Sequence, residues 1–150
     1  MAHTGGADRG QHRGTGCPVS YVAVKHVFGR NFLSFIMDPK KIHIWNVRGL
    51  NSRSRQDVVR TLVDSARVDV VCLRETKMPS ISPRDVFSML RADFNQFILL
   101  PSIGASGGIL VTSGRDVGVT GLTRDDNHSM LVQFSSRNNH PWWLTCVYGP

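Results

Sequence analysis

A nearly continuous apolar run at residues 68–73 constrains the fold more than any other feature of this sequence. A strand this apolar is typical of a sheet that is covered on both faces. Residues 58–66 repeat apolar side chains at helical spacing, and Ser52 or Ser54 can cap the start of that helix. Residues 41–45 alternate and favour β-branched and aromatic side chains, which predicts an earlier strand. The order strand, helix, strand predicts a parallel crossover in a mixed α/β sandwich.

The composition is that of a folded, basic domain. The chain has 150 residues, a hydrophobic fraction of 41% and a charged fraction of 19%, which excludes a disordered polyelectrolyte. No stretch approaches the roughly 18 apolar residues that a membrane span needs, so we expect no membrane partner. Lys and Arg number 18 against 11 Asp and Glu, which gives a net charge of +7. This balance favours an acidic partner such as nucleic acid, with solvated surface arginines as the alternative.

The remaining segments predict a leader, a short helix and further strands. Glycines and basic residues interrupt residues 1–36, and no apolar core there leads to a signal cleavage site, so we expect a disordered or non-homologous leader before a domain at 37–150. Pro83 suits the first turn of a helix over residues 83–90. Turn signals separate predicted strands at 96–100, 107–112, 128–134 and 142–148.

The cysteines indicate a reducing compartment. Cys17, Cys72 and Cys146 are an odd set at wide spacing, without the paired cysteines of a zinc site or a disulfide framework. Cys72 and Cys146 lie in apolar runs and are predicted to be buried free thiols. Because no secretory signal is recognised, we expect an intracellular protein, nuclear or cytoplasmic, and not a secreted one.

Two polar residues end the first two predicted strands. Asn46 follows the strand at 41–45, and Glu75, the only glutamate of the chain, comes just after the run at 68–73. Because the carboxyl ends of parallel strands meet at one edge of a sheet, these side chains should approach each other there. A carboxylate beside an amide suits a hard cation such as Mg²⁺. Each residue alone has another interpretation. Asn46 is also typical of a turn, and Glu75 is also typical of a solvated surface position.

Four motifs carry a resemblance to a known family. They are Trp-Asn-Val-Arg-Gly-Leu-Asn (45–51), Val-Cys-Leu-Arg-Glu-Thr-Lys (71–77), Ser-Gly-Gly-Ile-Leu-Val (106–111) and Trp-Leu-Thr-Cys-Val-Tyr-Gly-Pro (143–150). In this order they resemble the endonuclease/exonuclease/phosphatase superfamily. Within it, the sequence is most similar to the apurinic/apyrimidinic-endonuclease-like domain of plant non-LTR (LINE-type) retrotransposons. The resemblance covers residues 40–150.

This resemblance implies an α/β fold of the DNase I-like type, a four-layer α-β-β-α sandwich with its two sheets face to face. It also implies Mg²⁺- or Mn²⁺-dependent hydrolysis of a phosphodiester, with DNA as the substrate of the complete domain and a nick that leaves a 3′-hydroxyl. The residue matching Glu75 binds the metal, and the residue matching Asn46 lies beside the metal and helps to position the phosphate. The residue matching Tyr148 directs its hydroxyl at the phosphate.

The sequence departs from the family's pattern after Tyr148. The general-base aspartate of the family lies in a Gly-Asp-Phe-Asn-type motif beyond this tyrosine, and an Asp-His pair comes near the end of the domain. The Asp-Phe-Asn at 93–95 and the Asp-Asn-His at 126–128 mimic these motifs in composition but not in position. We therefore expect the N-terminal half of the domain, truncated at its C-terminus and inactive as a fragment. The missing half and the reverse transcriptase of the parent element are its candidate partners.

Arginines flank the predicted site. Arg48, Arg53 and Arg55 lie in the loop and helix start after the first strand and could contact DNA phosphates, with a solvated helix face as the alternative. Arg74 stands where the family usually has Gln, and it could pair with Glu75, meet a phosphate or have no role. Two further functions stay open. One is a basic nucleic-acid-binding module without catalysis, and the other is the same fold acting on a phosphoinositide or similar phosphoester.

Overall fold

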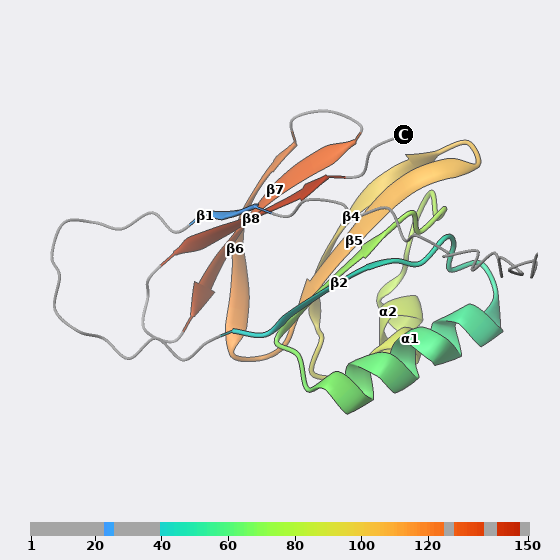
Figure 1. Ribbon diagram of the computed structural model, residues 1–150, viewed down its shortest axis with the longest axis horizontal. Helices are drawn as coiled ribbons and strands as arrows, with labels where there is room; N and C mark the ends of the chain where they lie inside the picture. Colours follow the sequence, from blue (N-terminus) through green and yellow to red (C-terminus); the bar gives the residue numbers. More distant parts are fainter. Residues whose placement is uncertain (1–22, 26–39, 125–127, 137–140, 148–150) are drawn as a thin grey trace, which may run out of the picture.

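The computed structural model describes residues 23–25, 40–124, 128–136 and 141–147. Its elements are β1 (Ala23–Lys25), β2 (Ile42–Asn46), α1 (Arg53–Ala66), β3 (Val70–Arg74), α2 (Pro83–Met89), β4 (Gln96–Ile103), β5 (Ser106–Ser113), β6 (Val117–Arg124), β7 (Ser129–Ser136) and β8 (Trp142–Val147). One sheet has the order β2-β3-β5-β4 and the other β1-β8-β7-β6. Within the described residues, both helices lie against the first sheet, and the second sheet covers its other face (Figure 1). The predicted mixed α/β architecture is confirmed.

The strand β3 lies inside the first sheet and has the predicted double burial. All of its residues are buried. β2 pairs with it in parallel, so that Ile42 lies opposite Val70 and Asn46 opposite Arg74, and α1 makes the crossover between the two strands. β5 pairs with the other side of β3 in antiparallel fashion. The predicted strand–helix–strand unit is therefore confirmed, with its parallel pairing.

Two hydrophobic cores lie on opposite faces of the first sheet. Successive residues of β3 pack into different cores, because successive side chains of a strand point to opposite faces of the sheet. Val71 and Leu73 pack towards the helices, and Val70 and Cys72 pack towards the second sheet. The core between the sheets contains Val70, Cys72, Leu100, Ile109, Val111, Val117, Met130, Val132, Phe134, Trp142, Leu144 and Cys146.

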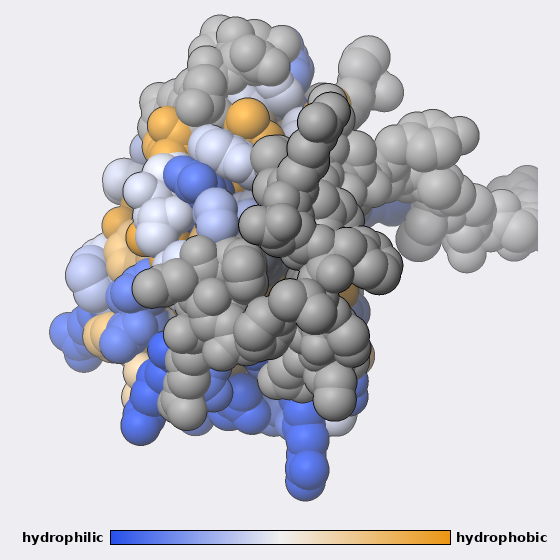
Figure 2. Space-filling model, turned by 90° about the vertical axis from the view of Figure 1, so that its left-hand side faces the viewer, coloured by the Kyte–Doolittle hydropathy of each residue, from blue (hydrophilic) through white to orange (hydrophobic). Residues whose placement is uncertain are grey.

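The helix α1 divides its apolar repeat between the core and the surface. Val59 and Val63, four residues apart, are buried, whereas Val58 and Leu62 are 51% and 38% exposed. In each pair of neighbours, 58–59 and 62–63, one side chain is exposed and the next is buried, because successive helical side chains point about 100° apart. Strongly hydrophilic residues gather along the lower border of Figure 2, the side on which Figure 1 places the helices. Neither helix of the described ranges has the length and apolarity that crossing a membrane requires.

Two strands differ from the expectations drawn from the sequence pattern. β6 contains Gly118 and Gly121, and its register with β7 shifts between Val119 and Gly121. Its residues therefore do not show the regular alternation of apolar and polar side chains that predicts a strand. β1 has only 3 residues and pairs with β8. These three residues lie within the leader predicted at 1–36, and the disordered or non-homologous character of that leader stays a prediction.

A capping box fixes the start of α2. The Ser82 side chain accepts a hydrogen bond from the Asp85 backbone N–H at 3.2 Å, and the Asp85 carboxylate accepts one from the Ser82 N–H at 2.9 Å. The hydrogen bonds from Ser82 lower the pKa of the Asp85 carboxyl below its ordinary value. The ionised carboxylate therefore stabilises the fold above its ordinary pKa, and this contribution is lost as the pH falls through the lowered value.

We expect Ser82→Ala to lower the free energy of unfolding by about 1 kcal/mol at neutral pH, because it removes the side-chain half of the cap. Urea unfolding measures the loss. Ser80→Ala, at an exposed serine of the preceding loop, is the matched control and should have no effect. The loss at Ser82 should shrink in acid, where Asp85 is protonated. Equal losses in the two variants would show that the capping box does not stabilise α2.

Candidate metal centre

The carboxyl ends of β2 and β3 bring two polar side chains together. Asn46 is the last residue of β2, and Glu75 follows β3 directly. The side-chain Nδ2 of Asn46 donates a hydrogen bond of 2.9 Å to Oε1 of Glu75. The approach predicted from the parallel crossover is confirmed. The roles of the two residues in metal binding and catalysis stay predictions.

The backbone beyond each strand adopts left-handed conformations. Glu75 and Lys77 have φ angles of 53° and 55°, and Gly49 has a φ of 109°. Residues other than glycine seldom have a positive φ, and such positions cluster at functional sites. The Leu50 N–H donates to the Thr76 carbonyl at 2.8 Å, which joins the segment after β2 to the segment after β3. The two segments therefore form one connected unit at the edge of the sheet.

The Ser-Gly-Gly segment at the start of β5 packs against the backbone next to Glu75. The N–H of Thr76 donates to the Gly108 carbonyl at 3.2 Å, and the N–H of Lys77 donates to the Gly107 carbonyl at 2.9 Å. A Cβ atom on Gly108 would clash with Oγ1 of Thr76, and Gly108 also has a φ of 89°. Only glycine fits this position without strain. The motif therefore helps to position the backbone that carries Glu75.

The Asn46–Glu75 pair leaves oxygen donors for a cation. Oδ1 of Asn46 is buried and has no hydrogen-bond partner. Unsatisfied buried acceptors are uncommon, and an ion or water would satisfy this one. Carboxylate and amide oxygens are hard ligands that suit Mg²⁺, which keeps several of its waters. The described residues contain no group of three or more His, Cys, Asp and Glu side chains placed to hold a metal, so the pair fits a cation that remains largely hydrated.

Arg74 joins the end of β3 to the end of β8. Its side chain is buried, with 3% exposed, and its Nη1 donates to the Val147 carbonyl at 2.8 Å. No ion pair links it to Glu75 within the described residues, so of the three alternatives for Arg74 the structure does not show this pairing. Tyr148, a predicted catalytic residue, lies outside the described residues. Its predecessor Val147 nevertheless ends β8 within reach of the Arg74 side chain.

The predicted phosphate-binding arginines differ in their surroundings. Arg48 and Arg55 are exposed, and Nη1 of Arg55 donates to the Arg48 carbonyl, which ties the loop to the start of α1. Arg53 pairs with the aspartate one helical turn later at 3.6 Å. Lys77 lies at the same edge, near Arg55, and is not among the residues predicted to bind phosphate. Its position two residues after Glu75 is the signal that could have identified it.

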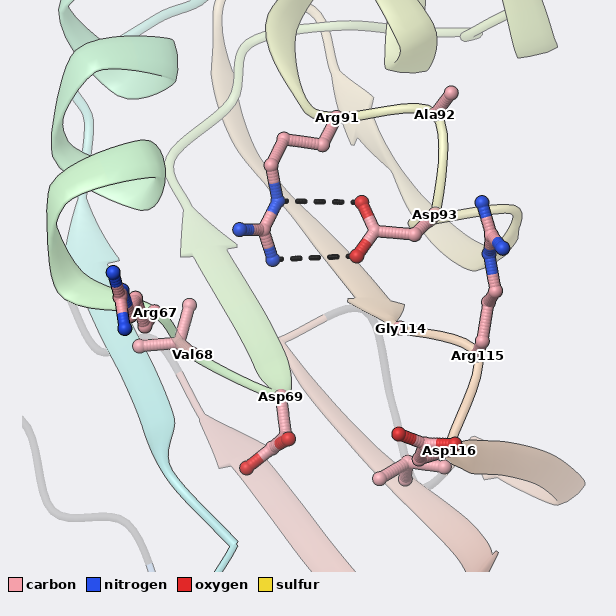
Figure 3. Close-up of a pocket in the computed structure, with 10 residues that line it drawn as sticks. Arg67, Val68, Asp69, Arg91, Ala92, Asp93, Gly114, Arg115 and Asp116 are labelled. Atoms are coloured by element: carbon pink, nitrogen blue, oxygen red, sulfur yellow. Dashed lines mark hydrogen bonds and ion pairs between the residues drawn. The ribbon is translucent and has the colours of Figure 1, made fainter.

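A cavity of about 590 Å³ at the opposite edge of the first sheet gathers charges of both signs (Figure 3). Its lining includes Arg67, Asp69, Arg91, Asp93, Arg115 and Asp116. Asp93 pairs there with Arg91, with Nε and Oδ1 3.2 Å apart. The Asp-Phe-Asn segment at 93–95 therefore lies at the wrong end of the sheet to act with Glu75. Of the second mimic, at 126–128, only His128 belongs to the described residues.

Cys72 and Cys146 are buried free thiols, as predicted. Their sulfur atoms lie 3.1 Å apart in the core between the sheets. The hydrogen bond with Cys146 and the burial of the thiol raise the pKa of Cys72 well above its ordinary value. Cys72 therefore acts as a small apolar side chain at neutral pH. Cys17 lies outside the described residues.

Comparison with known proteins supports the fold. No family model and no curated protein matches the sequence. Among solved structures, the chain is similar to the catalytic domain of Xenopus laevis APE2, with a TM-score of 0.51 and 14% sequence identity. The match covers 73% of this chain and 45% of that chain, so this chain spans less than half of its structural neighbour. The likeness shows a DNase I-like fold, as expected from the motifs.

We expect Gly108→Ala to destabilise the protein more than Gly104→Ala does. Both glycines have a positive φ, of 89° and 59°, so both variants carry the left-handed penalty of roughly 1–2 kcal/mol. Only Gly108 lacks room, because nothing lies within 4 Å of a Cβ on Gly104. Overpacking adds about 1–3 kcal/mol. Urea unfolding of the two variants measures the difference, and equal losses would contradict the close packing of Gly108 on Thr76.

Proposed function

We propose that this sheet edge is the metal-binding half of a phosphodiesterase active site that acts on DNA with Mg²⁺ or Mn²⁺. The observation that carries the proposal is the Asn46–Glu75 hydrogen bond, which leaves a buried amide oxygen unsatisfied beside a carboxylate. The DNase I-like fold and the motif at 71–77 support this function. The position of the pair at the carboxyl ends of parallel strands is where α/β sheets bind ligands.

Each residue of the proposed site has a distinct role. Glu75 would hold the cation through its carboxylate, and Asn46 would fix that carboxylate through Nδ2 while its Oδ1 accepts from the hydrated cation. Tyr148 directs its hydroxyl at the phosphate. When bound, the cation neutralises charge on the phosphate oxygens. A general base that activates water belongs, in the family pattern, to a motif that follows Tyr148.

The site predicts weak binding of Mg²⁺, at millimolar affinity or below, because few protein ligands are available. A ligand that binds only the folded state at ten times its dissociation constant raises the free energy of unfolding by about 1.4 kcal/mol. Urea unfolding with and without Mg²⁺ should show a gain of this size. Glu75→Gln should abolish the gain.

Asp64→Asn is the matched control for this measurement, because Asp64 is an exposed carboxylate on α1 and the substitution removes the same charge. It should leave the gain from Mg²⁺ unchanged. A gain that survives Glu75→Gln, or that Asp64→Asn removes, would place the cation elsewhere and overturn the proposed site.

We propose further that the chain derives from the endonuclease of a plant non-LTR retrotransposon, on the strength of the four motifs between residues 45 and 150. On this proposal residues 1–150 alone do not nick supercoiled plasmid in Mg²⁺, because the general-base motif of the family is not among them. General acid–base catalysis contributes roughly 10²–10⁴-fold to a rate. Nicking by the purified chain that Glu75→Ala abolishes would show that the residues present suffice.

Extension of the chain by the downstream half of a related retrotransposon endonuclease should restore Mg²⁺-dependent nicking that leaves a 3′-hydroxyl. Glu75→Ala in the extended protein should abolish it. The alternative function, a basic nucleic-acid-binding module without catalysis, predicts the opposite pattern. The chain alone would bind DNA with an affinity that falls steeply with salt, and the extended protein would not nick.

A further inference from the structure

Arg74 is a buried cation that forms no ion pair with the described residues. Its side chain is 3% exposed, and it has one hydrogen-bond acceptor, the Val147 carbonyl. Its Nε is buried without a partner, and no ion pair of the described residues includes it. A buried ion without a counter-charge is costly, and one neutral carbonyl does not supply that charge. Arg74 therefore marks a place where an anion would be stabilising.

The position of Arg74 is next to the Asn46–Glu75 pair. Asn46 and Arg74 are opposite each other in the parallel pairing of β2 and β3, and neighbouring strands lie about 4.8 Å apart. Ile44 of β2 packs against the core between the sheets, and Cys72 of β3 belongs to it. Because side chains alternate along a strand, Asn46 and Arg74 share this same face.

Two unsatisfied groups of opposite polarity thus lie on one face of the sheet, at paired positions of neighbouring strands. Oδ1 of Asn46 is an acceptor without a donor, and Nε of Arg74 is a donor without an acceptor. A phosphate oxygen would satisfy the guanidinium, which has a planar set of N–H groups suited to two-pronged contacts with phosphate. Arg48 and Arg55 are exposed at the same edge, and they add positive charge that favours a polyanion.

We propose that Arg74 is a phosphate-binding residue, whose Nε–H donates to a non-bridging oxygen of a nucleic-acid phosphodiester beside the Asn46–Glu75 pair. This inference deepens the proposed function and rests on it for the choice of nucleic acid as ligand. Arg74 then has two tasks, since Nη1 holds the end of β8 while Nε binds the phosphate. The phosphate contact needs no metal, so it can be tested independently of metal binding.

The direct test observes the Nε–Hε signal of Arg74 by ¹⁵N–¹H NMR on the full chain in EDTA. Titrations with inorganic phosphate and with the dinucleotide TpT separate free phosphate from a phosphodiester. We expect a saturable shift of the Arg74 signal with TpT that exceeds the shift with inorganic phosphate. The Nε signal of Arg115, which lies beyond the far end of β5, should stay in place.

A pair of variants provides the second readout. Arg74→Gln should weaken binding of a short DNA duplex about tenfold and reduce the slope of log affinity against log salt by about one. Arg115→Gln removes the same charge beyond the other end of β5, where the strand alone spans about 13 Å from Ile109, opposite Arg74, to Ser113. It should change neither quantity. Fluorescence anisotropy in EDTA measures both, and near-ultraviolet circular dichroism shows whether each variant keeps its fold.

The outcomes separate this inference from the proposed function. If the Arg74 signal does not move and Arg74→Gln binds DNA as the unaltered chain does, Arg74 only tethers β8 and the inference is wrong. A larger response to inorganic phosphate than to TpT would also overturn it, in favour of a small phosphorylated ligand. Should Arg74→Gln fail to fold, the NMR titration of the unaltered chain still decides. The proposed metal site fails on a different result, a Mg²⁺ effect that Glu75→Gln does not remove.

Discussion

The structure depends on one strand, β3, that is buried on both of its faces. Its side chains alternate between the core under the helices and the core between the sheets. Displacing it would expose both cores, at about 25 cal/mol for each Å² of apolar surface. A strand so constrained also holds its carboxyl end in a fixed place. Arg74 ends this strand and Glu75 follows it, so the proposed site rests on a strand whose residues are all buried.

The sequence predicts the parts of the fold that follow from local patterns. The apolar run at 68–73 and the helical repeat at 58–66 suffice for the parallel crossover, and this crossover in turn predicts the approach of Asn46 to Glu75. The pattern does not predict β6, because a bulge near Gly121 breaks its alternation. Nor does it predict β1, which has 3 residues and depends on a tertiary pairing with β8.

Details of the site depend on contacts between segments that lie far apart in the sequence. The partner of Arg74 is a carbonyl at the end of β8, 73 residues later, and no local signal identifies it. The positive φ of Glu75 arises where the backbone leaves β3 and meets the Gly107–Gly108 segment. Only the glycines of that segment are visible in the sequence. Their close packing on Thr76 requires the folded sheet.

The two edges of the first sheet differ in how their charges are satisfied. At the far edge, Asp93 pairs with Arg91, and Asp69 accepts a hydrogen bond from the Lys41 N–H at 2.8 Å. At the near edge, the carboxylate of Glu75 has an amide for a partner, and buried donor and acceptor atoms remain unsatisfied. Acidic residues are more numerous at the far edge, whereas the near edge places an unsatisfied amide oxygen, Oδ1 of Asn46, on the side chain that bonds a carboxylate. The near edge is the better site for a hydrated cation.

Paramagnetic broadening by Mn²⁺ tests this central claim most directly. Substoichiometric Mn²⁺ is added to ¹⁵N-labelled protein, and the loss of NMR signal is followed at each amide. The account predicts that the side-chain amide of Asn46 and the backbone amide of Glu75 broaden first, before any signal at the far edge. Earlier broadening at Asp69, Asp93 and Asp116 would place the cation in the charged cavity and contradict the account.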